Sequence, residues 1–244
     1  MMNLYVLMAR DSDSAELVYR LRGGPVFDAL NLMRDGGLRV HVPGRTGAEV
    51  PTLPGRGHAI FADLSVMVDR PDRWAHLIGL DCPIILDVHF PLGFPDHTLT
   101  VQPGRTDEAR DQEEDRKAQE YWSDLRRIDL AMTMVMESTV VTCPRRDWAE
   151  PISWVSRRRV QILPNVTDPE SGREYTIAFL KMLDQAYRAK QRRLPLTRRH
   201  RIVARLIRTS GIQAMARRHV ADKVMSTLEQ SDIDWTRYSS HAED

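Results

Sequence analysis

The sequence has few of the features that give a small protein a covalent or metal-bound framework. Its 244 residues include two cysteines, Cys82 and Cys143, which are too few for a disulfide scaffold and suit a reducing, cytoplasmic setting. The eight histidines show no zinc-type spacing. No run approaches eighteen apolar residues, which argues against a membrane span. The short apolar run near the start has no basic flank before it, so it predicts a first strand rather than a signal peptide.

Common sequence signatures of nucleotide binding and nucleophilic catalysis are missing as well. The chain has no G-x-G-x-x-G fingerprint, no G-x-x-x-x-G-K-[ST] P-loop and no G-x-S-x-G elbow. The absence of the first signature disfavours binding of an NAD-type cofactor.

The charge is nearly balanced overall but is unevenly distributed. The formal net charge is +1, yet between Lys181 and Lys223 thirteen Lys or Arg stand against two acids, a local net charge of +11. The rest of the chain must then sum to about −10, much of it in the segment "TDEARDQEEDRKAQEYWSD" at 106–124. The sequence therefore predicts an acidic body with a basic C-terminal segment.

The first two thirds of the chain alternate between strand-like and helix-like segments. Short apolar runs predict six strands, at 4–9, 38–42, 59–64, 83–89, 138–144 and 160–165. Helical patterns lie between them, at 25–35, 70–80, 107–136 and 146–155. Strands that alternate with helices predict an α/β fold with a Rossmann-like parallel sheet flanked by helices.

The pattern changes after Asp168, where no convincing strand remains. Apolar spacing predicts helices at about 173–187, 196–208 and 210–230. We therefore expect a Rossmann-like domain over 1–168 and a basic helical extension over 169–244.

Two Gly-Gly pairs flank the helix predicted at 25–35. Gly36 and Gly37 follow the helix, where glycine ends helices in the left-handed conformation. Gly23 and Gly24 precede it, and two explanations are open. They form an ordinary turn, the more common case, or they let a phosphate approach the N–H groups of the helix N-terminus.

The clearest strand ends in two polar residues, in "PIILDVHFP". Asp87 and His89 lie at its carboxyl end, where ligands bind in open α/β sheets. They are two residues apart and so point to the same side of an extended chain. An imidazole beside a carboxylate can act as a general base near neutral pH. Hydrogen bonding within the loop is an equally plausible role for both residues.

Two Asp-rich triplets raise the question of a metal. The triplet Asp11 to Asp13 follows the first strand, and Asp232 to Asp234 lies near the C-terminus. Paired carboxylates can hold Mg²⁺ beside a diphosphate, but Asp-Ser clusters are also typical of turns. We favour the turn interpretation at both places and expect no metal site.

The basic segment 188–223 has three possible roles. It could track the phosphates of a nucleic acid or lie on an anionic membrane. It lacks interleaved aromatic residues, which makes nucleic acid the weaker choice. It could also be a solvated helix face paired with the acidic segment at 107–124.

The order of these motifs resembles the N-terminal half of the GT-B glycosyltransferases, especially the family-4-like group. The likeness covers about residues 4–168 and lies in "GGPVFDALNLMRDGGLRVHV", "PIILDVHFP", "STVVTCPRRDWAEPI" and "VQILPNVTDP". Each motif is weak alone, and their order carries the resemblance.

The resemblance implies transfer of a sugar from a nucleotide sugar, with no cofactor and no bound metal. By this analogy His89 or Asp87 would be catalytic and face the acceptor, and Gly23 and Gly24 would approach the donor phosphates. Three further residues in or near these motifs complete the predicted substrate-binding set: Arg22, Asp11 and Asn165.

The chain also departs from the family pattern. Val166 and Thr167 stand where the family usually has Gly-Val, and the second Rossmann domain that binds most of the donor should follow Asn165. We therefore expect a glycosyltransferase or the acceptor-side half of one, the half being completed by a donor-domain partner protein or by a homodimer. The alternatives are a non-catalytic subunit that recruits a partner or a membrane, and a nucleic-acid-binding protein.

Overall fold

The computed structural model describes residues 2–9, 12–33, 38–42, 58–80, 82–89, 126–191 and 210–239. These residues form one six-stranded sheet in which every neighbouring pair of strands is parallel. The strands are β1 (Met2–Leu7), β2 (Leu38–His41), β3 (His58–Asp63), β4 (Ile84–Asp87), β5 (Val140–Cys143) and β6 (Val160–Ile162). The prediction of a parallel α/β sheet is confirmed, with each strand beginning within two residues of its predicted start.

The strands are ordered β2-β1-β3-β4-β5-β6 across the sheet. The chain therefore moves outward from β1 to β2 and then returns to the other side of β1 to form β3. This reversal is a topological switch point, and open parallel sheets bind ligands beside such points, at the carboxyl ends of their strands.

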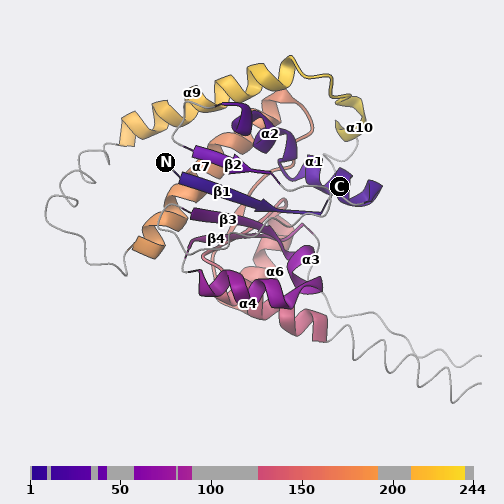
Figure 1. Cartoon of the computed structure of the whole chain (residues 1–244), viewed down its shortest axis with the longest axis vertical. Coiled ribbons are helices and arrows are strands. Elements are labelled where there is room, and N and C mark those ends of the chain that lie inside the picture. The colour runs from indigo at the N-terminus through magenta and orange to yellow at the C-terminus, as the bar shows by residue number, and fades with distance from the viewer. Residues whose placement is uncertain are drawn as a thin grey trace, which may run out of the picture.

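Helices cover both faces of the sheet (Figure 1). The helices on or near the first face are α1 (Asp13–Leu21), α2 (Gly24–Leu32), α7 (Pro169–Gln191), α9 (Ser210–Glu229) and the short α10 (Thr236–Ser239). Those on the second face are α3 (Leu64–Asp69), α4 (Pro71–Gly79), a helix over 126–137, and α6 (Arg146–Ser156).

Each face has its own hydrophobic core, as the alternation of side chains along a strand requires. Phe61 and Ile85 point to the first face and pack with Phe27 of α2 and Phe179 of α7. Their direct neighbours along the chain, such as Ile60 and Leu86, belong to the core of the second face. The sheet is thus the middle layer of three.

The long C-terminal helices belong to the first of these cores. Tyr175 and Phe179 of α7, and Val224 and Leu228 of α9, are buried in the same cluster as the sheet residues. Gly172 lets α9 come close to α7, because a Cβ there would lie 2.4 Å from a methyl group of Leu228. The boundary expected at residue 168 stays a prediction, but residues on both sides of it share one core.

Several predicted segments differ from the structure or lie outside the described residues. Helices α1, α3 and α10 were not predicted; α1 begins with Asp13 of the first Asp triplet, and Ser12 caps it by accepting a hydrogen bond from the Ala15 N–H. In the second triplet, Asp234 accepts hydrogen bonds from Thr236 as α10 begins. The predicted segments at 107–125 and 196–208, and Asp11, lie outside the described residues.

Candidate functional site

The carboxyl edge of the sheet brings together polar residues from β3, β4, β5 and the β6–α7 connection. In the strand register, Asp63 of β3 lies opposite Asp87 of β4, and Asp87 lies opposite Thr142 of β5. Both carboxylates are buried, with residue exposures of 3% and 0%. Because buried carboxylates need partners, the groups that satisfy each one define the site.

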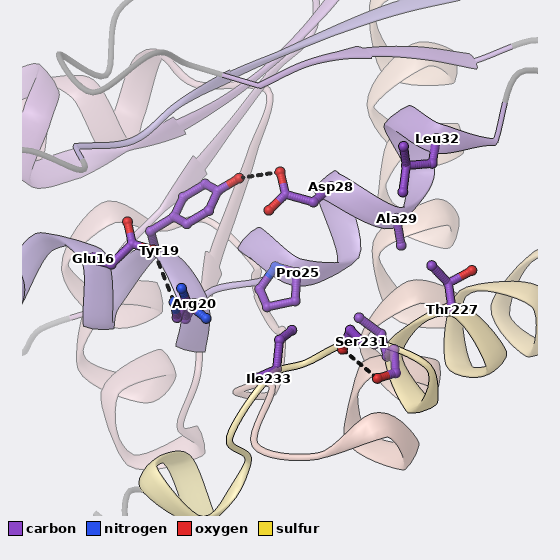
Figure 2. Close-up of a pocket in the computed structure, with 11 residues that line it drawn as sticks. Glu16, Tyr19, Arg20, Pro25, Asp28, Ala29, Leu32, Thr227, Ser231 and Ile233 are labelled. Atoms are coloured by element: carbon purple, nitrogen blue, oxygen red, sulfur yellow. Dashed lines mark hydrogen bonds and ion pairs between the residues drawn. The ribbon is translucent and has the colours of Figure 1, made fainter.

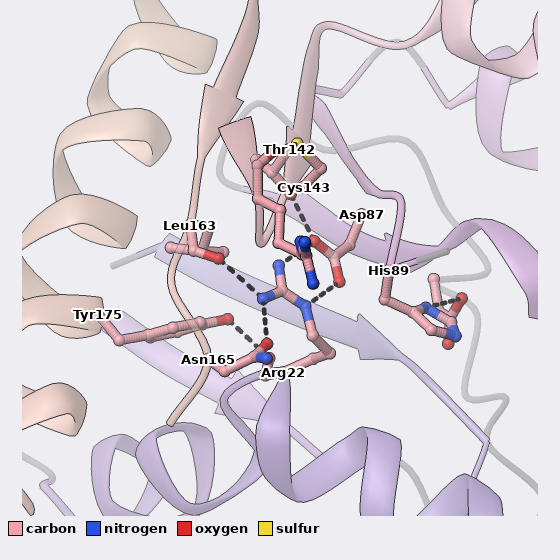
Figure 3. Close-up of polar contacts among 10 residues, drawn as sticks. Arg22, Asp87, His89, Thr142, Cys143, Leu163, Asn165 and Tyr175 are labelled. Atoms are coloured by element: carbon pink, nitrogen blue, oxygen red, sulfur yellow. Dashed lines mark hydrogen bonds and ion pairs between the residues drawn. The ribbon is translucent and has the colours of Figure 1, made fainter. Parts of the chain in front are cut away.

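Asp87 is satisfied by a buried arginine (Figure 3). Arg22 donates from Nε to Asp87 Oδ2 at 2.8 Å and from Nη2 to Asp87 Oδ1 at 2.6 Å, and Thr142 Oγ1 donates to Oδ1 at 2.7 Å. Burial lowers the pKa of Arg22, but the Asp87 carboxylate more than offsets this, so the pKa is raised and the guanidinium stays charged. The pair is bidentate, the strongest geometry for these groups.

The same arginine connects two distant parts of the chain. Its Nη1 donates to the Leu163 carbonyl at 2.8 Å and to Asn165 Oδ1 at 2.9 Å. Its own carbonyl accepts a hydrogen bond from the Tyr175 hydroxyl at 2.8 Å. Arg22 therefore fixes the corner between α1 and α2 to the connection between β6 and α7.

His89 is paired with Asp63 rather than with Asp87. Its Nδ1 lies 3.3 Å from Asp63 Oδ1, and its side chain is 17% exposed. Asp63 is itself held in place because the same oxygen accepts hydrogen bonds from the N–H and the hydroxyl of Ser65, both at 2.8 Å. Burial lowers the pKa of His89, but Asp63, with a smaller effect of Asp87, raises it above its usual 6.5.

This arrangement can support proton transfer. A carboxylate at Nδ1 favours the tautomer with its proton on Nδ1, which leaves Nε2 as the basic nitrogen. The imidazole is partly exposed while Asp63 is not, so only the imidazole is accessible to a substrate. Asp63 was not predicted as a site residue, although it ends β3 as Asp87 ends β4.

The glycine pair lies beside this site but is fully packed. Gly23 has φ of +99°, and a Cβ there would lie 2.3 Å from the ring of Tyr175. A Cβ on Gly24 would lie 2.3 Å from the ring of Tyr19. Both glycines are buried. Close packing of two tyrosines accounts for the pair, whereas its predicted approach to phosphates stays a prediction.

Of the seven predicted site residues, the structure brings four into contact or close proximity. Arg22, Asp87 and Asn165 share hydrogen bonds, and Asp87 acts on His89 through its charge. Gly23 and Gly24 continue the chain from Arg22, and Asp11 is outside the described residues. Within the described ranges, no group of three or more His, Cys, Asp or Glu is placed to hold a metal ion.

Cys143 ends β5 at the same edge, and its thiol is not available for chemistry. It is buried and donates to the Arg145 carbonyl at 3.1 Å. Burial raises the pKa of the Cys143 thiol to about 11. Since the thiolate is the reactive form, the thiol is inert at neutral pH.

We therefore expect Ellman's reagent at pH 8 to leave both buried cysteines of the folded chain unmodified. About one thousandth of Cys143 is ionised at that pH, and Cys82 is equally buried. Unfolding in guanidinium should expose two reactive thiols per chain. Rapid labelling of one thiol in the folded protein would contradict this assignment.

A cavity of about 250 Å³ lies elsewhere, between α1, α2 and the segment that follows α9 (Figure 2). Asp28 on its wall accepts a hydrogen bond from the Tyr19 hydroxyl at 3.1 Å, and Arg20 pairs with Glu16 at 3.0 Å. None of the predicted site residues lines it. The carboxyl edge remains the better candidate, because the predicted residues converge there.

In the described part of the basic segment, two arginines pair with an acid of α7, while Arg218 and Lys223 of α9 are exposed. Arg188 lies 2.5 Å and Arg217 4.0 Å from Asp184 of α7, and Asp222 of α9 pairs with Arg173 at 2.6 Å. The apolar side of α9 is buried against α7 and α2. Among the described helices, none is long and apolar enough to pass through a bilayer.

Comparison of the chain with protein-family models, with curated protein sequences and with solved structures gives no match.

Proposed function

We propose that this chain takes part in glycosyl transfer from a nucleotide sugar and that it supplies the acceptor side of the reaction. The observation that carries the proposal is the His89–Asp63 pair, a partly exposed imidazole backed by a buried carboxylate at 3.3 Å. It lies at the carboxyl edge of an all-parallel sheet, beside the reversal between β1 and β3. The motif order that resembles GT-B enzymes supplies the reaction class.

In the proposed reaction, His89 Nε2 accepts the proton of an acceptor hydroxyl while that oxygen bonds to the anomeric carbon of the donor sugar. The bond from that carbon to the diphosphate breaks, and the nucleoside diphosphate leaves with the electron pair. Asp63 stabilises the imidazolium that forms. Arg22 and Asp87 act by fixing the edge of the sheet on which His89 is placed.

The donor would reach this edge from a separate donor-binding protein or from a second copy of the chain. A purified chain can therefore be tested from both sides. One assay measures release of nucleoside diphosphate from UDP-, GDP- and dTDP-sugars. The other measures changes in the imidazole NMR signals of His89 on addition of simple saccharides.

Release of nucleoside diphosphate that His89→Gln lowers by about 10²–10⁴-fold would support the proposal directly. Perturbation of His89 by saccharides without donor turnover would support an acceptor-side half. His219→Gln is the matched control, because His219 is an exposed histidine of α9. If neither assay responds, the proposal fails and a non-catalytic subunit becomes the better account.

The pH dependence of activity tests the role of Asp63. A general base must be neutral, so the rate should rise with pH through a pKa above 6.5 and then level off. The same shift affects stability: the protonated imidazole stabilises the fold fully below pH 6.5, and this contribution is lost as the pH rises through the raised pKa.

Asp63→Asn keeps an oxygen for Ser65 but removes the charge that favours imidazolium. We expect the midpoint of the pH profile, or of the His89 NMR titration, to move to lower pH in this variant. Asp69→Asn is the control, because Asp69 is a surface carboxylate, 61% exposed, paired with Arg127. A midpoint that does not move would rule out Asp63 as the partner of His89.

A further inference from the structure

The outer face of α6 carries an exposed tryptophan that neither the fold nor the proposed function explains. Trp154 is 83% exposed, although tryptophan is among the residues that gain most from burial. Ala149 and Ile152 of the same helix are buried against the sheet. At 100° per residue, Trp154 lies on the side of α6 that faces away from them.

The charged residues nearest Trp154 along the helix are an acid before it and a base after it. Glu150 lies one turn before it, with its side chain 72% exposed, and the exposed Arg157 lies one turn after it. Two further arginines, Arg158 and Arg159, follow. Arg158 donates to the carbonyls of Met136 and Thr139. Within the described ranges, the structure records no ion pair for Arg157 or Arg159, and the exposed pair of Glu150 with Arg146 is long, at 3.5 Å.

We propose that this face of α6, defined by Glu150, Trp154 and Arg157, binds a second copy of the chain in antiparallel orientation. A two-fold axis beside Trp154 would place the two indole rings together. It would also place Glu150 of each copy near Arg157 of the other, so one surface would be complementary to itself. Isologous contacts of this kind are the commonest route to homodimers.

Charge order decides in favour of a second copy over other occupants. A uniformly basic face would suit an anionic membrane or a nucleic acid, but the first half of α6 carries Asp147 and Glu150, which pair with Arg145 and Arg146 at exposed positions. When two such helices lie antiparallel, Glu150 of one copy faces Arg157 of the other, so the order acid, tryptophan, base is complementary to itself. Tryptophan and arginine are also enriched among the residues that dominate interface energies.

The contact is small and leaves the candidate site open. A single pair of helices buries less than the standard interface of about 1,600 Å², so we expect association in the micromolar range. His89 and Asp63 belong to the carboxyl edge and not to this helix face. The inference therefore does not depend on the proposed function, and either can fail alone.

Sedimentation velocity on the full chain, from about 1 to about 300 μM, spans the range expected for such an interface. The wild type should shift from monomer to dimer, and Trp154→Ser should weaken dimerisation by about thirtyfold. Met215→Ser is the matched control, because Met215 is a 71% exposed apolar residue on α9. All these positions are exposed, so folding, followed by circular dichroism, should be unchanged.

Charge reversal tests the antiparallel arrangement itself. Glu150→Arg alone and Arg157→Glu alone should each weaken the dimer, and the double variant should restore it, because the two charges exchange across the axis. A wild type that stays monomeric throughout, or a double variant weaker than both single variants, would overturn the proposal.

Discussion

Replacing Arg22 by methionine should lower the free energy of unfolding by about 3–5 kcal/mol, the cost of breaking a buried ion pair by removing one partner. The guanidinium is 2% exposed and the Asp87 carboxylate is fully buried. Methionine fills part of the volume but leaves Asp87 with Thr142 as its remaining hydrogen-bond donor among those recorded. It also deprives Leu163 and Asn165 of their donor. Urea denaturation followed by circular dichroism measures the loss.

The neighbouring Arg20 provides a matched control. It also pairs with a carboxylate, Glu16, at 3.0 Å, but both side chains are about one third exposed. Because solvent screens such pairs, Arg20→Met should cost less than about 1 kcal/mol. A similar loss in the two variants would mean that burial of the Arg22–Asp87 pair has little energetic consequence.

A double variant distinguishes two causes of this loss: the missing attraction between Arg22 and Asp87, and the cost of leaving the Asp87 charge buried without its partner. Asp87→Asn removes the buried charge while keeping an oxygen for Thr142, so Arg22→Met with Asp87→Asn should be more stable than Arg22→Met alone. For two residues in contact, the changes in the free energy of unfolding that the single substitutions cause do not simply add. If the double variant is less stable than Arg22→Met by the full cost of the second change, the two residues are not coupled.

The sheet was predictable from the sequence because its signal is local. The segment "PIILDVH" is an almost continuous apolar run, as expected of a strand buried on both faces, and it forms β4. Helices α1 and α3 were not predicted because the residues at their N-termini are also typical of other structures. Ser12 and Asp13 are as typical of a helix N-cap as of a turn, and Asp63 ends β3 and caps α3 at once.

The side-chain pairs within the site were not predictable from the sequence. They depend on the register between neighbouring strands and on the turn between α1 and α2 that positions Arg22. Asp87 and His89 are close in sequence, yet the structure pairs Asp87 with Arg22, 65 residues away. His89 is paired with Asp63 of the neighbouring strand. A strand of four residues indicates which groups reach the sheet edge. It does not indicate which groups arrive there from other elements.

The Gly-Gly pair shows the same limit at a single position. Glycine is required where another group comes too close for a Cβ, but the local sequence does not reveal that group. At Gly23 that group is the ring of Tyr175. Tyr175 belongs to α7, which follows the last strand of the sheet in the sequence. The motif is accounted for by packing in the protein without any ligand.

Replacing Gly23 by alanine should therefore destabilise the free protein by about 2–5 kcal/mol. The left-handed conformation, with φ of +99°, costs an alanine about 1–2 kcal/mol, and overpacking against a buried ring costs about 1–3 kcal/mol. The tyrosine must move, which also strains its hydrogen bond to the Arg22 carbonyl. Urea denaturation without any ligand measures the effect.

Gly79→Ala is the control for this change, because a Cβ at Gly79 of α4 meets nothing within 4 Å. That variant should be neutral or more stable by up to about 1 kcal/mol, the helix preference of alanine over glycine. A glycine kept only for a bound phosphate would tolerate alanine far better in the free protein than one held against a ring. A loss of only about 1 kcal/mol in Gly23→Ala, as the backbone conformation alone would cause, would therefore contradict the packing role and favour the ligand interpretation of the pair.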